Sequence, residues 1–258
     1  MKLSTYILTK NNEQYIEEIL TQLSKCADEI VVLDSGSTDA TLDIVSRFPL
    51  TKVFHRPFDN FKDQRIFAAS LCQYDSVFYV DSDEIPDETL VNTLNKMKTE
   101  LTDLGTCGYG VTRYWFVMGR PVHSIYPIES PDHDIRLFDR RHVSFDTQSN
   151  IVHETLGGYT ETRLLDGSLT HRTFHTRQEL REKAEQYSGL AAQDMIRRKR
   201  KISRINTYLN PVAAFIKWYF FKLGFLDGRV GLLTGAYAYR YTKLKYRKAI
   251  QMINKPLK

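Results

Sequence analysis

The sequence predicts an α/β protein in which a parallel sheet carries helices on its faces. Strand and helix signals alternate through the first 90 residues, which is the order of successive β-α-β units. The segments Leu3–Leu8, Glu29–Leu33 and Val77–Val80 are mostly continuous apolar runs, which are typical of strands buried on both faces. Because such strands are joined by right-handed crossovers, we expect their carboxyl ends to lie at one edge of the sheet.

The connecting elements follow from local patterns. Gln14–Ser24 has apolar residues at helical spacing, Thr41–Phe48 follows a turn rich in capping residues, and Asp63–Gln73 is a third predicted helix. A short strand is predicted at Lys52–His55. The first half of the sheet is thus expected to be parallel.

After residue 107 the pattern changes to shorter strands separated by aromatic turns. We predict strands at Tyr109–Val117, Ile135–Phe138 and Leu164–His171, with mixed directions. A charged helix is predicted at Arg177–Lys201, and an aromatic, basic segment follows it to the end.

Charge is divided unevenly along the chain. Residues 1–175 contain 17 Lys and Arg against 26 Asp and Glu, whereas residues 176–258 contain 19 against 5, and the net charge is +5. An acidic body with a basic tail predicts an α/β domain over 1–175 and a helical region over 176–258.

The cysteines and the apolar runs indicate the compartment. Cys26, Cys72 and Cys107 are far apart and form no C-x-x-C, so neither a zinc site nor a disulfide framework is predicted. The N-terminal run is shorter than a signal peptide's apolar core. No stretch approaches the roughly 18 apolar residues that span a bilayer. We therefore expect a cytoplasmic protein.

The acidic segment Asp81-Ser82-Asp83-Glu84 follows directly on the Val77–Val80 strand. Open parallel sheets bind ligands at the carboxyl ends of their strands. Two carboxylates at such an edge offer hard oxygen ligands that suit Mg²⁺ or Mn²⁺. The alternative is that the tripeptide starts a loop and caps the helix after Pro86.

A second polar turn, Asp34–Thr41, follows the strand Glu29–Leu33. Gly36 permits a tight turn, and the polar residues after it can cap the next helix. Capping does not account for Asp34, whose place at the strand end suits an acceptor for a base or ribose. The turn lacks the G-x-G-x-x-G pattern, so a dinucleotide such as NAD is disfavoured.

Four motifs stand in the order and spacing seen in family 2 glycosyltransferases: Thr9-Lys10-Asn11-Asn12-Glu13, Asp34–Thr41, Gln64-Arg65 and Asp81–Glu84. The chain resembles that family, which has the GT-A fold, a Rossmann-like nucleotide-sugar-binding domain with a mixed central sheet. The resemblance implies an inverting, metal-dependent transfer from a nucleotide diphosphate sugar. It implies nucleotide contacts from Thr9 and Asp34, a diphosphate or ribose contact from Arg65, and metal binding by Asp83 with Asp81 nearby.

Later motifs resemble a narrower branch, the heptose-directed β-glucosyltransferases of the lipopolysaccharide inner core. They are Arg136-Leu137-Phe138, Val152-His153-Glu154, Leu169-Thr170-His171, Lys222–Gly228 and Gly231-Leu232. The branch implies transfer of a hexose to a hydroxyl of a lipid-anchored glycan, with UDP-glucose as the expected donor and UDP-galactose as its rival. The same-fold alternative is transfer to a polyprenyl phosphate or a capsule precursor.

An inverting transfer needs a carboxylate that takes the proton from the acceptor hydroxyl. Glu154 is our first choice because it follows a short apolar stretch and adjoins His153. Asp132 and Asp134 are rivals, although aspartates at such places also form turns and Glu154 can instead pair with an arginine. The Glu-Asp pair in which many family members keep the base is not evident here.

Two further groups of side chains have open roles. His171, at a predicted strand end, suits Mn²⁺ as an additional ligand, and the alternative is a core or surface histidine. Arg136, Arg140 and Arg141 can face acceptor phosphates, although a solvated face is the favoured interpretation.

The basic tail predicts two amphipathic helices, Ile205–Leu223 and Leu232–Lys248, separated by a Gly224–Gly231 break. Aromatic faces flanked by Lys and Arg are typical of helices that lie in an anionic membrane interface. The alternative is that both helices pack on the catalytic domain and their charges are merely solvated. Arg197–Lys201 also suits nucleic acid, but no nucleic-acid module is recognisable, so we expect none. The predicted place is peripheral, on the inner face of the cytoplasmic membrane.

Overall fold

The computed structural model describes residues 1–145, 156–200 and 202–254. The chain forms two compact units. Unit 1 comprises Met1–Arg113 with His133–His171, and unit 2 comprises Tyr114–Asp132 with Arg172–Lys258. The segment Tyr114–Asp132 therefore belongs with the C-terminal helices.

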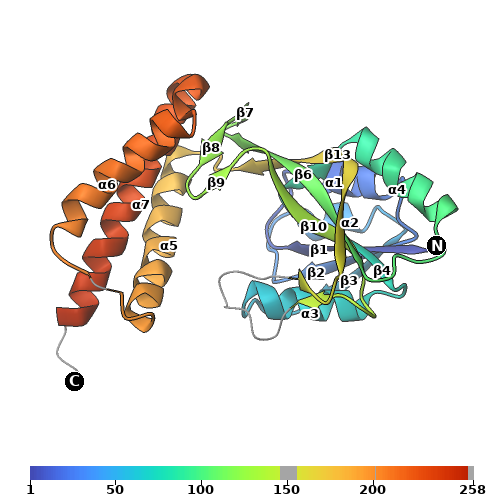
Figure 1. Ribbon diagram of the computed structural model, residues 1–258. Coiled ribbons are helices and arrows are strands. Elements are labelled where there is room, and N and C mark those ends of the chain that lie inside the picture. The colour runs from blue at the N-terminus through green and yellow to red at the C-terminus, as the bar shows by residue number, and fades with distance from the viewer. Residues whose placement is uncertain (146–155, 201, 255–258) are drawn as a thin grey trace. The chain divides into compact units, whose positions relative to one another are not determined.

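The main sheet begins with four parallel strands in the order β3-β2-β1-β4 (Figure 1). They are β1 (Leu3–Thr9), β2 (Glu29–Asp34), β3 (Thr51–His55) and β4 (Ser76–Asp81). The order continues β10-β6-β13-β5, with β10 antiparallel to β4 and β13 antiparallel to β5. These strands are β5 (Glu84–Pro86), β6 (Cys107–Val117), β10 (Asp132–Asp139) and β13 (Glu161–Thr173). The predicted parallel half and mixed second half are confirmed.

Helices cover both faces of the sheet in unit 1. They are α1 (Ile16–Leu23), α2 (Thr41–Val45), α3 (Phe61–Leu71) and α4 (Glu88–Glu100). Side chains such as Ile7, Val32 and Phe78 pack with α1, α2 and α4, whereas their neighbours Tyr6, Val31 and Tyr79 pack with α3. This alternation follows from the two-residue period of a strand.

The helix α4 has its own N-cap. Asp87 accepts a hydrogen bond from the amide of Leu90 at 2.7 Å, which satisfies a donor at the start of the helix. The Asp81–Asp83 tripeptide does not cap α4, so the capping alternative for that tripeptide is wrong.

Short strands complete the chain: β7 (Arg120–Pro121), β8 (Ser124–Ile125), β9 (Ile128–Glu129), β11 (Ser144–Phe145) and β12 (Leu156–Gly157). The strand β7 pairs with the end of β6, β8 pairs with β9, and β11 pairs with β12.

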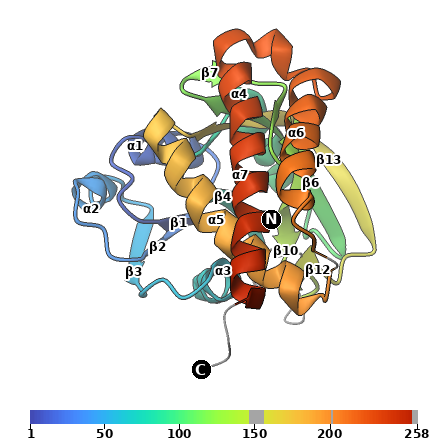
Figure 2. The same cartoon turned by 90° about the vertical axis from the view of Figure 1, so that its left-hand side faces the viewer.

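Unit 2 places α5 (Arg177–Arg197), α6 (Asn206–Ile216) and α7 (Gly228–Asn254) side by side (Figure 2). The predicted helix Ile205–Leu223 is interrupted, because α6 passes into a π-helical turn, Lys217–Phe221, and Leu223 takes a left-handed φ of 59°. A 3-10 turn, η2 (Gly224–Asp227), then leads directly into α7.

Gly231 explains why the break is short. A Cβ added at Gly231 would lie 1.6 Å from the carbonyl oxygen of Gly224, so α7 packs directly on the 3-10 turn. Only glycine permits this approach. The predicted start of the second helix, Leu232, was therefore placed too late.

The apolar face predicted for the second helix lies in the core of unit 2. Tyr237 is buried with Trp115 and Phe174, and Leu233 and Tyr241 pack against the same cluster. For this face of α7 the packing alternative is right. Among the described helices, none combines the length and the hydropathy that a membrane span requires.

Candidate active site

Predicted site residues from three strands meet at the carboxyl edge of the parallel sheet. Thr9, at the end of β1, is paired in register with Asp34 at the end of β2. On the other side of β1, Leu8 is paired with Asp81 at the end of β4. The predicted sheet edge therefore brings Thr9, Asp34 and Asp81 together.

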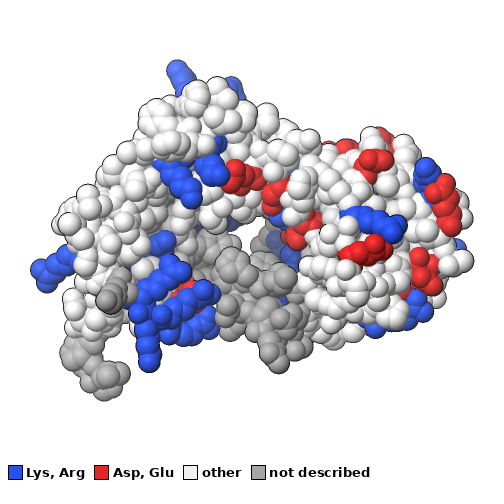
Figure 3. Space-filling model, in the orientation of Figure 1, with Lys and Arg blue, Asp and Glu red and all other residues white. Residues whose placement is uncertain are grey.

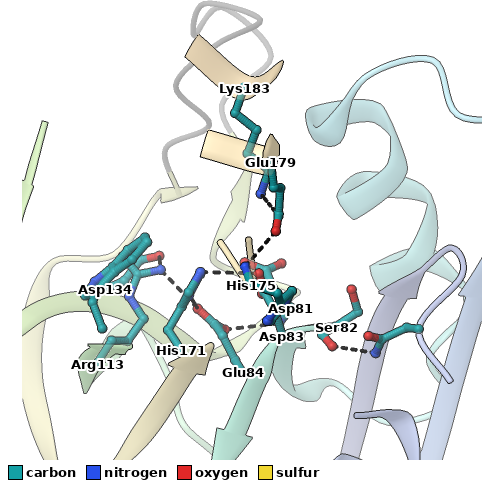
Figure 4. A network of polar contacts seen from close by, with 12 residues as sticks. Asp81, Ser82, Asp83, Glu84, Arg113, Asp134, His171, His175, Glu179 and Lys183 are labelled. Atoms are coloured by element: carbon teal, nitrogen blue, oxygen red, sulfur yellow. Dashed lines mark hydrogen bonds and ion pairs between the residues drawn. The ribbon is translucent and has the colours of Figure 1, made fainter. Parts of the chain in front are cut away.

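The loops after these strands are tied to one another. The amide of Asn11 donates to the Ser37 hydroxyl at 2.9 Å, and the amide of Thr38 donates to Asn11 Oδ1 at 2.7 Å. The side-chain amide of Asn12 donates to the carbonyl of Ser82 in the acidic segment (Figure 4). Each loop is thus held at the edge by its neighbour.

Asp34 is buried and shapes its own turn. Its carboxylate accepts hydrogen bonds from the amides of Gly36 at 2.9 Å and Ser37 at 3.1 Å, and from the Ser37 hydroxyl at 2.5 Å. Burial opposes ionisation, but these hydrogen bonds and His55 lower the pKa of Asp34 below its ordinary value. These hydrogen bonds hold the turn and do not cap α2, which begins at Thr41.

Thr9 differs from Asp34 in its hydrogen bonding. Its side chain is buried, and its hydroxyl oxygen has no hydrogen-bond partner among the described residues. Buried hydroxyl groups are normally hydrogen-bonded, because an unpaired one costs free energy. The Thr9 hydroxyl is thus a buried polar group at the sheet edge whose hydrogen-bonding capacity is unused among the described residues.

Asp81 lies between two arginines. Arg65, from α3, donates to Asp81 Oδ1 at 2.6 Å, and Arg136, from β10, donates to Oδ2 at 3.3 Å. Both guanidinium groups lie over the ring of Tyr79, at 4.8 and 4.5 Å from its centroid. Burial alone would raise the pKa of Asp81, but the two arginines hold it below its ordinary value.

Glu84 is the most deeply buried carboxylate of the site, with no exposed surface. It pairs with Arg136 at 2.6 Å, with Arg113 at 3.2 Å and with His171 Nδ1 at 3.2 Å. Burial opposes its charge, yet Arg136 and then His171 hold the pKa of Glu84 well below its usual range. Arg136 is fully buried, so its predicted solvated position was wrong.

Asp83 faces His171. The distance from Asp83 Oδ2 to His171 Nε2 is 3.4 Å, and the other ring nitrogen faces Glu84 across the β5–β13 pairing (Figure 4). Burial alone would lower the pKa of His171, yet Asp83 and Glu84 raise it to about 10. Asp83 keeps about a third of its side-chain surface exposed, so it is accessible to a ligand.

The three candidate bases have different surroundings. Asp132 accepts a hydrogen bond from the Trp115 indole at 2.9 Å. Asp134 lies 3.5 Å from both Arg113 and Arg136, and it lines a cavity of about 440 Å³ in unit 1. Tyr79, Tyr159 and Arg163 also line this cavity. Glu154 lies outside the described residues.

The arrangement holds carboxylates ionised beside two buried guanidinium groups at the strand ends. The model of the family described as glycosyl transferase family 2 matches residues 4–188 of this chain. The chain is a family 2 glycosyltransferase. The predicted family and the predicted GT-A α/β fold with C-terminal helices are confirmed.

Two curated relatives of this glycosyltransferase are bacterial. An uncharacterised glycosyltransferase of Rickettsia typhi is 26% identical over 94% of this chain and 85% of its own length. The lipopolysaccharide core biosynthesis glycosyltransferase LpsC of Rhizobium meliloti is 27% identical over 92% of this chain and 88% of its own length.

Solved structures of two other proteins are also similar. TarS of S. aureus, in complex with UDP, is 17% identical with a TM-score of 0.47, over 96% of this chain and 92% of that one. Glucosyl-3-phosphoglycerate synthase of Mycobacterium tuberculosis, in complex with Mn²⁺, UDP and glucosyl-3-phosphoglycerate, is 24% identical with a TM-score of 0.36. That match covers 45% of this chain and 44% of the synthase.

Sequence reasoning on this glycosyltransferase did not predict the ion pairs that Glu84 makes with Arg113 and Arg136 at the edge of the site. In the sequence Glu84 stands only as the last residue of the acidic motif. The available signal was that Glu84 begins a short strand with the apolar residues Ile85 and Pro86, in which all three residues are buried. A carboxylate in such a strand requires a cationic partner.

Proposed function

We propose that this glycosyltransferase moves a hexose from a nucleotide diphosphate to a hydroxyl of a lipid-anchored glycan, with inversion at the anomeric carbon. UDP-glucose is the proposed donor and the lipopolysaccharide inner core the proposed acceptor, on the sequence motifs and the similarity to LpsC. The observation that carries the proposal is the meeting of Thr9, Asp34 and Asp81 at one sheet edge.

In the proposed complex the nucleotide lies over the ends of β1 and β2. The unpaired Thr9 hydroxyl is a donor and acceptor for the base or ribose. Asp34 is ionised and can accept one further hydrogen bond, while it keeps its turn in shape. Arg65, held by Asp81, is assigned to the diphosphate, since a guanidinium group matches phosphate oxygens.

The donor atoms at Asp83 and His171 fit a divalent cation. Once His171 has lost its proton to make room for the ion, a carboxylate and an imidazole 3.4 Å apart form a mixed oxygen and nitrogen set that suits Mn²⁺, and Mg²⁺ can bind through the carboxylate. Asp81 lies beside them but is engaged by Arg65. Among the described residues no three such side chains form a metal cluster, so water and diphosphate would complete the shell. The ion would supply positive charge to the departing diphosphate.

For the general base we propose Glu154, with Asp134 as the alternative. Asp134 is favoured over Asp132 because it lines the cavity, whereas Asp132 is held by Trp115. The cavity has aromatic and polar walls, which suit the faces and hydroxyls of an acceptor sugar.

We also propose that the enzyme works at the inner face of the cytoplasmic membrane. A lipid-anchored acceptor is confined to that surface, and the C-terminal region is strongly basic, with 19 Lys and Arg against 5 Asp and Glu over residues 176–258.

Nucleotide binding is the first test. UDP with Mn²⁺, at 100 times its dissociation constant, should add about 2.7 kcal/mol to stability, which is roughly 5–10 °C in melting temperature. Thr9→Val keeps the shape and removes the unpaired hydroxyl. The unliganded variant should therefore be no less stable, while its UDP-dependent shift should shrink. GDP, CMP and ADP are the controls, and an equal shift in Thr9→Val would remove Thr9 from the site.

The base assignment is tested by turnover. Glu154→Gln should lower kcat by about 10²–10⁴-fold while the UDP-dependent thermal shift is retained, because a general base acts on the acceptor and not on the nucleotide. Asp134→Asn and Asp132→Asn are the matched variants. If Asp134→Asn loses turnover and Glu154→Gln keeps it, the base is Asp134.

A further inference from the structure

The surface of α6 and the two turns after it exposes large apolar side chains. The exposed set, here called the α6–η2 face, comprises Ile205, Tyr208, Leu209, Val212, Ile216, Phe220, Phe221, Leu223, Phe225 and Leu226. Phe221 is 76% exposed and Tyr208 71% exposed. Soluble monomers rarely leave a contiguous apolar surface of this kind uncovered, so it indicates a partner.

The α6–η2 face is not the side by which α6 joins unit 2. That side carries Pro211 and Trp218, which are buried, and Phe215, which contacts α7 at Gly235. A Cβ added at Gly235 would lie 3.1 Å from Phe215, so the two helices are closely packed there. Apolar side chains thus lie on two sides of the helix, but only one of these sides is covered within unit 2.

The charges that this part of the chain carries are mostly positive. Residues 199–229 contain seven Lys and Arg and one acidic residue, Asp227. Asp227 is buried and paired with His123 at 2.5 Å, so it contributes little negative charge to the surface. Lys222 pairs with Glu129, whereas Lys217 lies beside the Trp218 ring. Figure 3 shows Lys and Arg gathered over the C-terminal helices, around largely uncharged surface.

We propose that the α6–η2 face inserts into the headgroup region of a membrane that contains anionic lipids. Aromatic and aliphatic side chains rimmed by cations match such a surface in both polarity and charge. A second copy of the chain fits less well, because a twofold contact through this face would bring like charges together. This membrane contact depends on the proposed function in one respect only, since its role would be to bring the enzyme to a lipid-anchored acceptor.

The proposal assigns membrane contact to α6 and its turns, and not to α7. The aromatic face of α7, with Tyr237 and Leu233, packs inside unit 2 and is not available to lipid. The membrane surface is therefore narrower than the whole basic tail.

Sedimentation of the full chain with lipid vesicles tests the proposal. Leu209→Gln/Phe221→Gln should bind vesicles of phosphatidylcholine with one quarter phosphatidylglycerol at least ~10-fold more weakly than wild type, since two exposed apolar anchors are lost. Leu190→Gln/Ile253→Gln changes two exposed apolar residues on α5 and α7, and should bind as wild type does. Pure phosphatidylcholine and high salt should both weaken binding.

The proposal would be overturned if the two double variants bound anionic vesicles equally well, or if the wild-type protein did not bind them. A dimer that the α6–η2 variant abolishes, without vesicle binding, would assign the face to self-association instead. Sugar transfer to a soluble acceptor, measured on the same proteins, separates this result from the catalytic proposal. Vesicle binding without any transfer would count against the proposed reaction and leave the membrane face standing.

Discussion

Asp83→Ala should lower sugar transfer by at least roughly 10³-fold. Asp83 is the exposed carboxylate of the acidic segment, and His171 is the side chain that it faces. A bound divalent ion contributes several kcal/mol to the stabilisation of developing charge, and each 1.4 kcal/mol corresponds to a tenfold change in rate. The measurement is turnover with UDP-glucose at saturating Mn²⁺.

The same substitution should leave unit 1 folded. Asp83 is about a third exposed, and its one described contact is with His171, which keeps Glu84 as a second partner. Since Glu84 continues to pair with the buried His171, the loss of stability should be small. The UDP-dependent thermal shift should lose its dependence on Mn²⁺, because the carboxylate that we assign to the ion is gone.

Asp87→Ala is the matched control. Asp87 lies four residues further on, in the same segment, but its carboxylate caps α4. Losing this cap should cost about 1 kcal/mol of stability and little activity. If Asp83→Ala and Asp87→Ala retain similar turnover, the acidic segment is structural and the metal assignment is wrong.

The parallel half of the fold was predictable because its signals are local. The buried strands Leu3–Leu8 and Val77–Val80 lie within one residue of the observed β1 and β4 at each end. Continuous apolar strands that alternate with amphipathic helices are compatible with few sheet topologies. The shared edge of Thr9, Asp34 and Asp81 therefore follows from the order of the elements.

The second half was less predictable, because its contacts are distant in sequence. The strand β5 follows β4 in the chain but lies at the far end of the sheet, where it pairs with β13. That crossing brings His171 beside Glu84, 87 residues earlier. No local sequence pattern indicates which strand will pair with β5 at the edge of the sheet. The ion pairs of Glu84 could therefore not be predicted from the sequence.

The C-terminal helices show a different limit. Helical spacing correctly predicted apolar faces on both helices, but spacing cannot tell whether a face meets protein or lipid. The observed burial separates a covered face from an exposed one, since Tyr237 on α7 is buried and Phe221 is exposed. The close approach of Gly231 to Gly224, which fixes this arrangement, depends on the absence of a side chain, and sequence spacing does not reveal such a contact.

Arg136→Met should destabilise unit 1 by about 3 kcal/mol or more, a loss of roughly 6–12 °C in melting temperature. The methionine fills most of the space and removes the charge that faces Glu84 at 2.6 Å and Asp81 at 3.3 Å. Both carboxylates would then keep their charge in a buried site with fewer partners. Arg163→Met, at a pair in which both side chains are more than half exposed, should change the melting temperature little.

The double variant Arg136→Met/Glu84→Gln decides the physical cause. If the cost of Arg136→Met comes from the uncompensated Glu84 charge, neutralising Glu84 should recover part of the stability. The loss of stability in the double variant should then be smaller than the sum of the losses in the two single variants. If the two single losses add up to the loss in the double variant, the cost instead reflects lost packing on Tyr79, whose ring centroid lies 4.5 Å from the Arg136 guanidinium. Arg136→Lys keeps a charge without the planar fork and should fall between wild type and Arg136→Met. A melting temperature unchanged in Arg136→Met would mean that Arg113 and His171 alone satisfy Glu84.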